Sequence, residues 1–396
     1  MHLVESAGAN LLRYRVEDFI FGGSHYARLA RMSAAGIPVL TIVHGSATAG
    51  GAYMPGMSDY VVMVRDRARA FLAGPPLLKA ATGEIATEEE LGGALMHASV
   101  SGLAEYLAED DADAIRALRE HLRRLAWHRH ESDLPAATEP RFAADELLSI
   151  MPVDGRKPVD MREIIARLCD DSDFMEFQST YGPATVCVHA SIGGLPVGIL
   201  SNNGPLDPAG SSKATHFIQQ CCQSGLPLIY LQNTTGYIVG KESERAGMIK
   251  HGSKMIQAVA NATVPQVTIQ CGASYGAGNY GMCGRGFAPR FLFSWPNART
   301  AVMGAEQAAG TMAIVMEASA RDRGLEPDRA QIDGMRAKIV ETFDRQTSSF
   351  YTSGRLLDDG IIDPRDTRGV LTQVLQLFRR ADGLQLRPLT FGVARP

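Results

Sequence analysis

The sequence lacks most of the features that mark secreted or membrane-spanning proteins. Its six cysteines include no C-x-x-C pair, so neither a zinc ribbon nor a redox motif is expected, and free, mostly buried thiols are the simplest interpretation. No apolar run approaches the roughly 18 residues that a membrane span needs. The first ten residues also lack the basic and apolar segments of a secretion signal. We therefore expect an intracellular protein without a membrane span. These absences leave the compartment open between the bacterial cytoplasm and the mitochondrial matrix.

Positive charge is also scarce, and several nucleotide motifs are missing. Lys and Arg total 39 against 43 Asp and Glu, for a net charge of −4, and neither half has the basic cluster that a phosphate backbone requires. There is no G-x-x-x-x-G-K-[ST] loop and no strand-linked G-x-G-x-x-G. A nucleophile elbow is missing too, because the Gly45–Gly50 segment has the wrong spacing. Nucleic-acid binding, nucleotide hydrolysis, hydride transfer and serine-hydrolase chemistry therefore have no support.

The length of the chain predicts two domains. A single core rarely accommodates 396 residues, and a polar segment with two prolines, Glu131–Pro140, is the best candidate for a linker. We place the domains at residues 1–133 and 141–396. Strand-like and helix-like patterns alternate along both, which is typical of an α/β fold.

The predicted elements follow from apolar patterning and turn residues. Strands are predicted at Ile37–Val43, Tyr60–Val64, Thr185–Ala190, Leu195–Ser201 and Pro227–Gln232. Helices are predicted at Tyr26–Ala35, Asp110–His130 and Pro158–Asp170, from a Thr87/Glu90 capping box to about His97, and from a cap at Ser211 or Ser212 to about Gln223.

The stretch that organises the chain is Ala262–Met282, in which a β-branched strand leads into a glycine-rich turn and a helix start. The same design occurs 227 residues earlier, without a gap, at Ala35–Tyr53. Seven of these nineteen positions are identical, mostly at the strand and the turn. The chain therefore has two related halves, and each carries one glycine turn.

The repeat extends upstream, but the two halves are unequal. Leu3–Gly8 corresponds to Leu231–Gly236, and the second half has roughly ninety residues between the linker and this strand. The first half has almost none before its equivalent. We therefore expect the first half to be truncated, because the chain is a fragment, because another polypeptide supplies the missing layer, or because the half has been reduced.

The glycine turns offer backbone chemistry rather than acid–base chemistry. No Asp, Glu, His or Lys lies between Gly272 and Gly281, and the nearest charged side chain is Arg285. Exposed N–H groups, helped by the positive end of a following helix, suit an oxyanion. Two such turns suggest that two carbonyl-like oxygens are held at once. The alternative is that the glycines serve only close packing of helix and strand.

Three isolated residues have side chains that can be functional groups, but ordinary roles explain them. His44 and His216 lie in apolar sequence surroundings and are interpreted as core or interface histidines. Lys79 follows a Pro-Pro turn and could contact a phosphate, but an exposed lysine there needs no special role.

Several longer motifs carry a family resemblance. They are Leu231–Tyr237 (LQNTTGY), Gly272–Arg285 (GASYGAGNYGMCGR), Pro289–Asn297 (PRFLFSWPN), Met303–Ala309 (MGAEQAA), Gly45–Asp59 (GSATAGGAYMPGMSD) and Phe71–Glu84 (FLAGPPLLKAATGE). Together they closely resemble the carboxyltransferase (β) subunits of biotin-dependent acyl-CoA carboxylases, and most of all the methylcrotonyl-CoA and geranyl-CoA carboxylase branch.

The resemblance implies two tandem crotonase-like domains with ClpP/crotonase spiral ββα topology, the first of them truncated. The N-terminal domain would lie on the acyl-CoA side and the C-terminal domain on the biotin side, with the active site between domains of different subunits. The reaction implied is carboxyl transfer from carboxybiotin, on a carrier protein, to an acyl-CoA. The implied partners are a biotin carboxylase with its carrier subunit and further copies of the chain, at least a dimer and in the family a hexamer.

The resemblance also implies site residues. Gly50 and Gly51 would donate to the thioester oxygen as it becomes an enolate, and Gly276 and Ala277 would hold the ureido oxygen of biotin. Tyr275 and Gly278 would complete the biotin-binding segment, and no metal is expected. The protein needs no base of its own, because biotin can take the substrate proton after it gives up the carboxyl group. A biotin-independent decarboxylase or hydrolase, or a non-catalytic partner in a split complex, are the alternatives.

Overall fold

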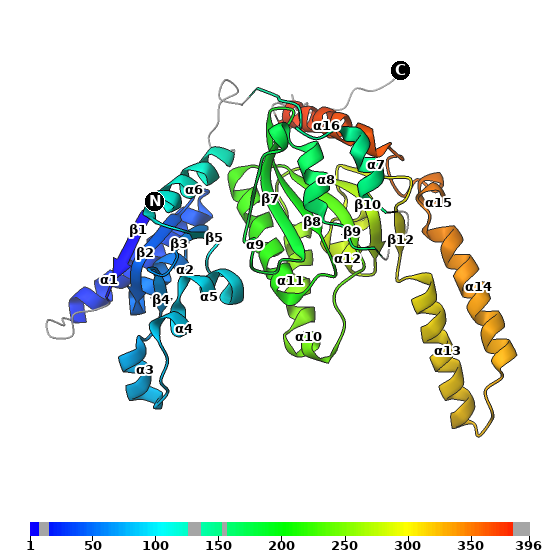
Figure 1. Cartoon of the computed structure of the whole chain (residues 1–396), viewed down its shortest axis with the longest axis horizontal. Helices are drawn as coiled ribbons and strands as arrows, with labels where there is room; N and C mark the ends of the chain where they lie inside the picture. Colours follow the sequence, from blue (N-terminus) through cyan, green and yellow to red (C-terminus); the bar gives the residue numbers. More distant parts are fainter. Residues whose placement is uncertain (8–15, 126–135, 153–156, 383–396) are drawn as a thin grey trace, which may run out of the picture.

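The structure is a computed structural model that describes residues 1–7, 16–125, 136–152 and 157–382. Its first half contains β1 (His2–Ser6), α1 (Val16–Ala34), β2 (Leu40–Thr48), α2 (Tyr53–Gly56), β3 (Tyr60–Val64), β4 (Arg69–Phe71), α3 (Pro75–Thr82), α4 (Glu88–Gly92), α5 (Ala94–Met96), β5 (Tyr106–Ala108) and α6 (Asp111–Arg124) (Figure 1). The helix predicted at Asp110–His130 is shorter than predicted, because Leu125 is extended and α6 ends at Arg124. The first part of the predicted linker lies outside the described residues. The division into two domains therefore stays a prediction.

The second half begins with α7 (Leu147–Ile150) and α8 (Met161–Leu168). Its further elements are β6 (Phe174–Glu176), β7 (Thr185–Ile192), β8 (Leu195–Asn202), α9 (Pro208–Ser224), β9 (Leu228–Thr234), α10 (Lys241–Arg245), α11 (Met248–Ala260), β10 (Gln266–Tyr275), α12 (Gly278–Gly281), β11 (Phe291–Ser294), β12 (Arg299–Ala301), α13 (Ala305–Asp322), α14 (Arg329–Thr347), α15 (Ser349–Gly354) and α16 (Thr367–Asp382). The two strands predicted as a hairpin are β7 and β8, which pair antiparallel.

The strands of the described residues form two sheets. The first has the order β1-β2-β3-β5 with β4 also on β2, and all its pairs are parallel. The second has the order β11-β10-β9-β8-β7-β6 with β12 on β10, and only the pairs of the β6-β7-β8 meander are antiparallel. The α/β class predicted from the alternating pattern is therefore confirmed, with mixed and parallel sheets.

The internal repeat is visible in the strand register. Leu3 pairs with Ile42 in the first sheet, and Leu231 pairs with Ile269 in the second. The central strands β2 and β10 are thus related by 227 residues, whereas β1 and β9 are related by 228. On the other side, β3 and β4 flank β2 as β11 and β12 flank β10. The predicted correspondence of Leu3 with Leu231 is therefore confirmed, but the single offset of 227 residues is wrong for this strand by one residue.

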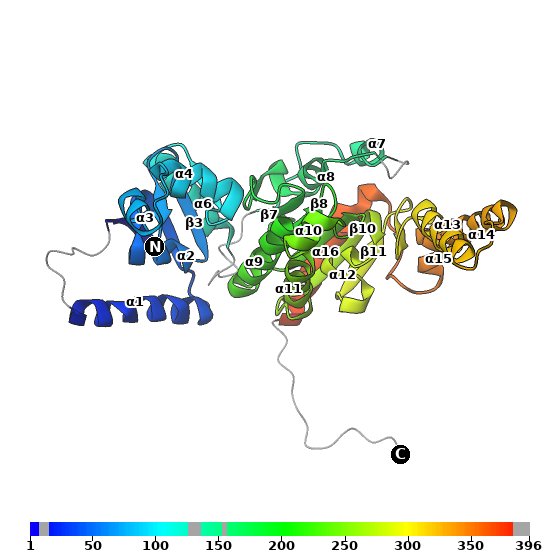
Figure 2. The same cartoon turned by 90° about the horizontal axis from the view of Figure 1, so that it is seen from below.

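The larger hydrophobic core joins the two halves. Val43 and Tyr60 of the first sheet belong to the same cluster of buried side chains as Phe217 of α9 and Tyr230 of β9. A second cluster lies on the other face of the second sheet, under α8 and α16 (Figure 2). The helix α9 therefore lies between the two sheets, which fixes the first sheet against the second half.

Polar contacts cross the same interface. The Asp59 carbonyl accepts hydrogen bonds from Gln220 Nε2 at 2.9 Å and from His216 Nε2 at 3.2 Å. The Glu105 carboxyl accepts from the Val61 N–H at 2.5 Å and from Gln178 Nε2 at 2.8 Å. The interpretation of His216 as an interface histidine is confirmed.

His44 differs from its predicted place in an apolar environment. Its side chain is one-third exposed, and its Nδ1 lies 4.0 Å from an Asp111 carboxylate oxygen. The reason is that β2 leaves the buried part of the sheet at this residue, after a run of four buried positions.

Two helix starts test the capping predictions. The Thr87/Glu90 box is present in both directions, but α4 ends at Gly92 because Gly93 is extended, so no single helix reaches His97. The predicted cap of α9 at Ser211 or Ser212 is wrong. Asp207 caps this helix through Gly210 N–H, because Pro208 starts the helix three residues earlier.

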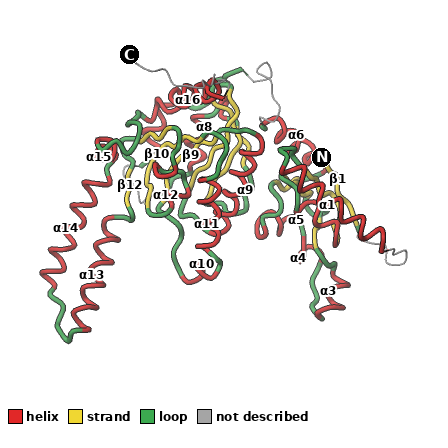
Figure 3. Tube along the Cα trace, turned by 180° about the vertical axis from the view of Figure 1, so that it is seen from behind, coloured by secondary structure: helices red, strands yellow, loops and turns green. Residues whose placement is uncertain are grey.

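Helices α13 and α14 form a two-helix arm that extends from the end of β12 away from the sheets (Figures 1 and 3). Within the described ranges, no helix combines the length and the apolar character that crossing a bilayer requires.

The buried carboxyl of Glu105 predicts a pH-dependent stability. Burial raises the pKa of Glu105 to about 8 from 4.5, and burial lowers the pKa of the neighbouring His216, whose Nδ1 lies 3.6 Å away, so both groups are neutral. A raised folded pKa gives stability that is complete below the unfolded pKa and is lost as the pH rises through about 8. Glu105→Gln should remove this loss. The melting temperature of the variant, measured by calorimetry, should rise relative to that of wild type by several degrees as the pH is raised from 6 to 9. A difference between the two proteins that stays constant across this range would contradict the assignment.

Candidate functional site

The two glycine turns have the same backbone. After β2 the chain turns through a short 3-10 helix, Ala49–Ala52, and after β10 it turns at Gly276. Ala49 and Gly276 are equivalent, and both have a φ of 55°, in the left-handed region. This conformation sends the chain out of the sheet at the end of its central strand. The predicted strand-turn-helix design is therefore confirmed at both places.

Several glycines of these turns are required by close packing. A Cβ on Gly51 would lie 2.8 Å from the Ser6 Cβ, and one on Gly278 would lie 2.8 Å from the Gly236 Cα. Six residues before these glycines, the central strands also pack closely on a neighbouring strand. A Cβ on Gly45 would meet the Glu5 side chain, and a Cβ on Gly272 would meet the Asn233 side chain. The packing alternative is thus correct for these four glycines, and it is compatible with a role for their N–H groups.

The N–H groups of the turns fall into two classes. The Gly276 N–H donates to the Ala301 carbonyl of β12 at 2.9 Å, so it is already used. In the part of the chain that the structure describes, no hydrogen bond runs from the N–H of Gly50, Gly51, Ala277 or Gly278 to a group outside its own turn. Gly50 and Ala277 are exposed. Gly51 is half-buried and Gly278 is buried, so Gly50 and Ala277 are the accessible donors, and Gly51 and Gly278 are the unused donors beside them.

The following helices are shorter than expected. Both α2 and α12 have four residues, and the chain leaves the helical conformation at Met57 and Met282. Because a helix dipole is the sum of many aligned peptides, a single turn adds little positive potential. The help expected from the helix ends is therefore small, and the individual N–H groups are the main donors of the turns.

Charged groups are nearly absent at the second turn, as predicted. Arg285 is held in an ion pair with Asp359 at 2.9 Å. Tyr275 is half-buried, and burial raises its pKa, so its hydroxyl stays neutral. No group of metal-ligating side chains comes together within the described ranges. The turn can therefore bind an oxygen atom, but it supplies no acid or base.

The remaining sequence candidates are not functional groups at the turns. All six cysteines are free and all but Cys222 are buried, and burial raises the pKa of the buried thiols. Lys79 lies exposed on α3. Two residues that the sequence did not single out do lie at the first turn. Glu5 packs on Gly45, and the Tyr26 hydroxyl donates to the Gly50 carbonyl at 2.6 Å.

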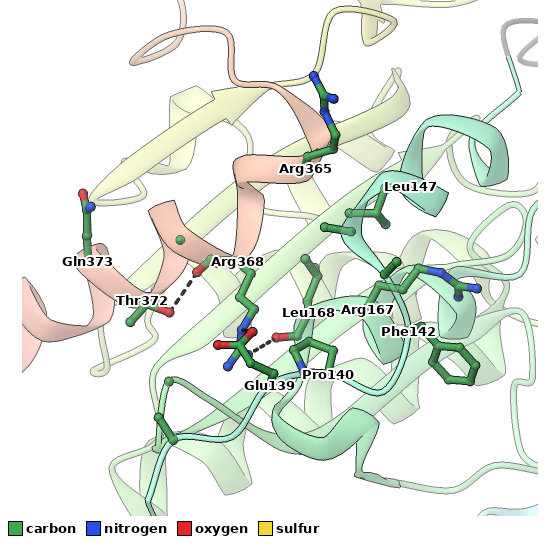
Figure 4. A pocket seen from close by; sticks show the side chains of 15 residues that line it. Glu139, Pro140, Phe142, Leu147, Arg167, Leu168, Arg365, Arg368, Thr372 and Gln373 are labelled. Atoms are coloured by element: carbon green, nitrogen blue, oxygen red, sulfur yellow. Dashed lines mark hydrogen bonds and ion pairs between the residues drawn. The ribbon is translucent and has the colours of Figure 1, made fainter.

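A cavity of about 620 Å³ lies elsewhere, between α16, α7 and the segment before it (Figure 4). Its arginines are already paired, since Arg368 binds Asp170 at 2.7 Å and Arg167 binds Glu163 at 2.8 Å. The cavity therefore has no unpaired cation for an anionic ligand, and neither glycine turn lines it.

The two turns are far apart within one chain. In both views α9 and α11 stand between α2, which follows the first turn, and α12, which follows the second (Figures 1 and 2). One ligand cannot contact both turns of the same chain.

Comparisons with known proteins identify the relatives of this chain. The family model described as carboxyl transferase domain matches residues 1–385. A probable biotin-dependent acyl-coenzyme A carboxylase beta2 subunit of Mycobacterium tuberculosis is 51% identical over 99% of this chain and 74% of the relative.

Two solved structures are also similar. The geranyl-CoA carboxylase beta subunit of P. aeruginosa is 51% identical, with a TM-score of 0.62 over 99% of this chain and 73% of that chain. The transcarboxylase 12S hexamer, solved with methylmalonyl-coenzyme A bound, is 31% identical, with a TM-score of 0.84 over 100% and 75%. This chain thus spans about three quarters of each relative's length.

The close approach at Gly278 predicts a large effect of one methyl group. In Gly278→Ala the new Cβ meets the backbone of Gly236, which cannot move aside cheaply, so we expect a loss of about 1–3 kcal/mol of unfolding free energy. Gly286→Ala is the matched control, because a Cβ there meets nothing within 4 Å, and it should stay within about 0.5 kcal/mol of wild type. Urea denaturation of both variants measures the difference, and equal midpoints would refute the packing argument.

Proposed function

The chain belongs to the carboxyltransferase β subunits of biotin-dependent acyl-CoA carboxylases, and we propose that it transfers a carboxyl group from carboxybiotin to a branched enoyl-CoA such as 3-methylcrotonyl-CoA. The branch is supported by relatives of 44–51% identity that are named for methylcrotonyl-CoA or geranyl-CoA carboxylases or for a related acyl-CoA carboxylase. The finer fold assignment, a crotonase-like spiral in both halves, is part of the same proposal.

The observation that carries the proposal is the duplicated pair of backbone donors. Each turn offers two adjacent N–H groups after a residue at φ 55°, and among the described residues none of these four N–H groups has a partner outside its own turn. Transfer of a carboxyl group from carboxybiotin to an acyl-CoA builds negative charge on two oxygens, the ureido oxygen of biotin and the thioester oxygen, and both need stabilisation. Preorganised backbone donors give such stabilisation without a titrating group.

The first turn is proposed to hold the thioester oxygen. The N–H groups of Gly50 and Gly51 would bind it as the methyl group that is conjugated to the thioester through the double bond loses its proton, when negative charge builds on this oxygen. Each donor removed from such a site typically lowers the rate on the order of 10²–10³. Ser6 and the end of β1 support the turn from behind, because Gly51 packs directly on Ser6.

The second turn is proposed to hold the ureido oxygen of biotin. Its N–H groups fit a neutral carbonyl-like acceptor, because Arg285, the nearest charged side chain in the sequence, is held in an ion pair with Asp359. Carboxybiotin would supply the carboxyl group and a basic nitrogen for the substrate proton. Of the expected donors, Ala277 keeps its role and its neighbour Gly278 joins it. Gly276 shapes the turn, since its N–H binds Ala301, and Tyr275 lies at the end of the strand.

A complete site is proposed to form between two copies of the chain. The two turns lie on opposite sides of α9 and α11, so the thioester and ureido oxygens would be held by turns of different subunits (Figures 1 and 2). A dimer is the smallest assembly that achieves this, and a hexamer is supported by the 12S relative. The remaining partners are a biotin carboxylase and a biotin carrier subunit.

A second candidate follows from the completeness of each turn. The first turn alone could stabilise an enolate, which is enough for biotin-independent decarboxylation of an acyl-CoA.

The experiment that separates the two candidates is carboxylation of 3-methylcrotonyl-CoA by the full chain with a biotin carboxylase, a biotinylated carrier, ATP and bicarbonate. Carboxylated product supports the proposal. Turnover of malonyl-CoA without biotin or partners, with no carboxylation, would favour the second candidate.

The donor role of the first turn predicts a selective loss of rate. In Gly51→Ala the new methyl group meets the Ser6 side chain and displaces the Gly51 N–H, so kcat should fall on the order of 10²-fold. Gly56→Ala, five residues on, is the control, because a Cβ there meets nothing within 4 Å and kcat should be unchanged. Initial rates at saturating acyl-CoA measure both, and a fully active Gly51→Ala would remove this turn from the mechanism.

A further inference from the structure

We propose that Tyr26 is a positioning residue of the first turn, holding the peptide between Gly50 and Gly51 so that the Gly51 N–H points at the substrate oxygen. The inference rests on the proposed function, because it concerns the donors for the thioester oxygen.

Tyr26 reaches the turn from a distant element. It lies on α1, and its hydroxyl donates to the Gly50 carbonyl at 2.6 Å. The ring is held by edge contacts, with its centre 6.2 Å from that of Tyr53 and 6.0 Å from that of His25. A Cβ on Gly50 would lie 2.8 Å from the hydroxyl oxygen, so this contact requires glycine at position 50.

The geometry of a peptide transmits this contact to the donor. The Gly50 carbonyl and the Gly51 N–H belong to one planar peptide group and point in opposite directions. A hydroxyl that fixes the carbonyl therefore fixes the direction of the N–H. It also polarises the peptide, because hydrogen bonds in a chain strengthen one another.

The second turn does without such a contact. Its equivalent carbonyl, on Ala277, accepts from Tyr280 and Gly281 of its own turn, at 3.0 and 3.1 Å, and from no other group among the described residues. The residue related to Tyr26 by 227 positions is Ser253, which is exposed, and no hydrogen bond among the described residues joins it to the turn. The Tyr26 contact is therefore a property of the first turn alone.

A difference in backbone strain explains the asymmetry. Ala49 occupies the left-handed region with a side chain, whereas the equivalent Gly276 has none. The second turn is further tied by the Gly276 N–H to Ala301. The first turn thus has the less favourable residue, Ala49, in the left-handed conformation. The hydrogen bond from the Tyr26 hydroxyl, which comes from outside the turn, helps to hold the turn in this conformation.

Tyr26→Phe tests the proposal, since it keeps the ring and removes only the hydroxyl, and Ser253→Ala is the control at the related position. The full chain is assayed with its biotin carboxylase and carrier on 3-methylcrotonyl-CoA. We expect kcat of Tyr26→Phe to fall about tenfold, less than the loss on the order of 10²–10³ for a deleted donor, with KM for acyl-CoA changed less than about twofold. Ser253→Ala should match wild type in both. A hydroxyl that only anchors α1 would lower the melting temperature and leave kcat unchanged, which would overturn the proposal.

Hydrogen exchange measured by mass spectrometry gives a readout that does not need activity. Exchange across Ala49–Met57 should be faster in Tyr26→Phe than in wild type, whereas exchange across Gly276–Met282 should be unchanged. If the wild type transfers no carboxyl group but this local change occurs, the proposed function fails and the positioning role stands. If the wild type is active and neither exchange nor kcat changes in the variant, the positioning role fails.

Discussion

The structure of both halves depends on how a buried parallel strand ends. Strands β2 and β10 pair with strands on both sides, with a register shift on one side of each, until a residue at φ 55° sends the chain out of the sheet. The peptides after that residue can no longer reach the ladder, so their N–H groups face away from it. Donors of this kind need no titration and little reorganisation, because the folded sheet fixes their direction. The glycines that flank them are needed because the turn must also fit against the end of the next strand.

This constraint links the turns to elements that take no part in the chemistry. The first turn packs on Ser6 of β1, and the second packs on the loop after β9, so the site geometry depends on strands that carry no donor. The first sheet is in turn fixed by α9, through the shared core and through the carbonyl of Asp59, which receives hydrogen bonds from His216 and Gln220. Burial keeps the Glu105 carboxyl neutral at the same interface, so the buried charge that joins the halves is that of Arg124, which is paired with Asp173.

The sequence predicted the features that local rules govern. Tyr60–Val64 was predicted to the residue, because a run of buried β-branched side chains bounded by polar residues has few alternatives. The two turns could be aligned because glycine is required at close approaches. Features set by contacts between distant segments could not be predicted. The Gly276 N–H is used because β12 pairs beside β10, and Tyr26 reaches Gly50 across 24 residues. The missed Asp207 cap is different, since Asp-Pro before a helix was a local signal that could have been used.

The separation of the turns bears on why the chain has two of them. A duplicated unit places equivalent donors at equivalent positions, but α9 and α11 keep the two turns apart within each copy (Figures 1 and 2). A reaction that stabilises two oxygens within a few ångströms of each other can use both turns only if they come from different copies. Each copy would then offer its first turn to one neighbour and its second turn to another, or both to the same neighbour in a two-fold dimer. In that arrangement the acyl-CoA and biotin turns can diverge in detail, as Ala49 and Gly276 have, while the shared backbone keeps their donors in the same geometry.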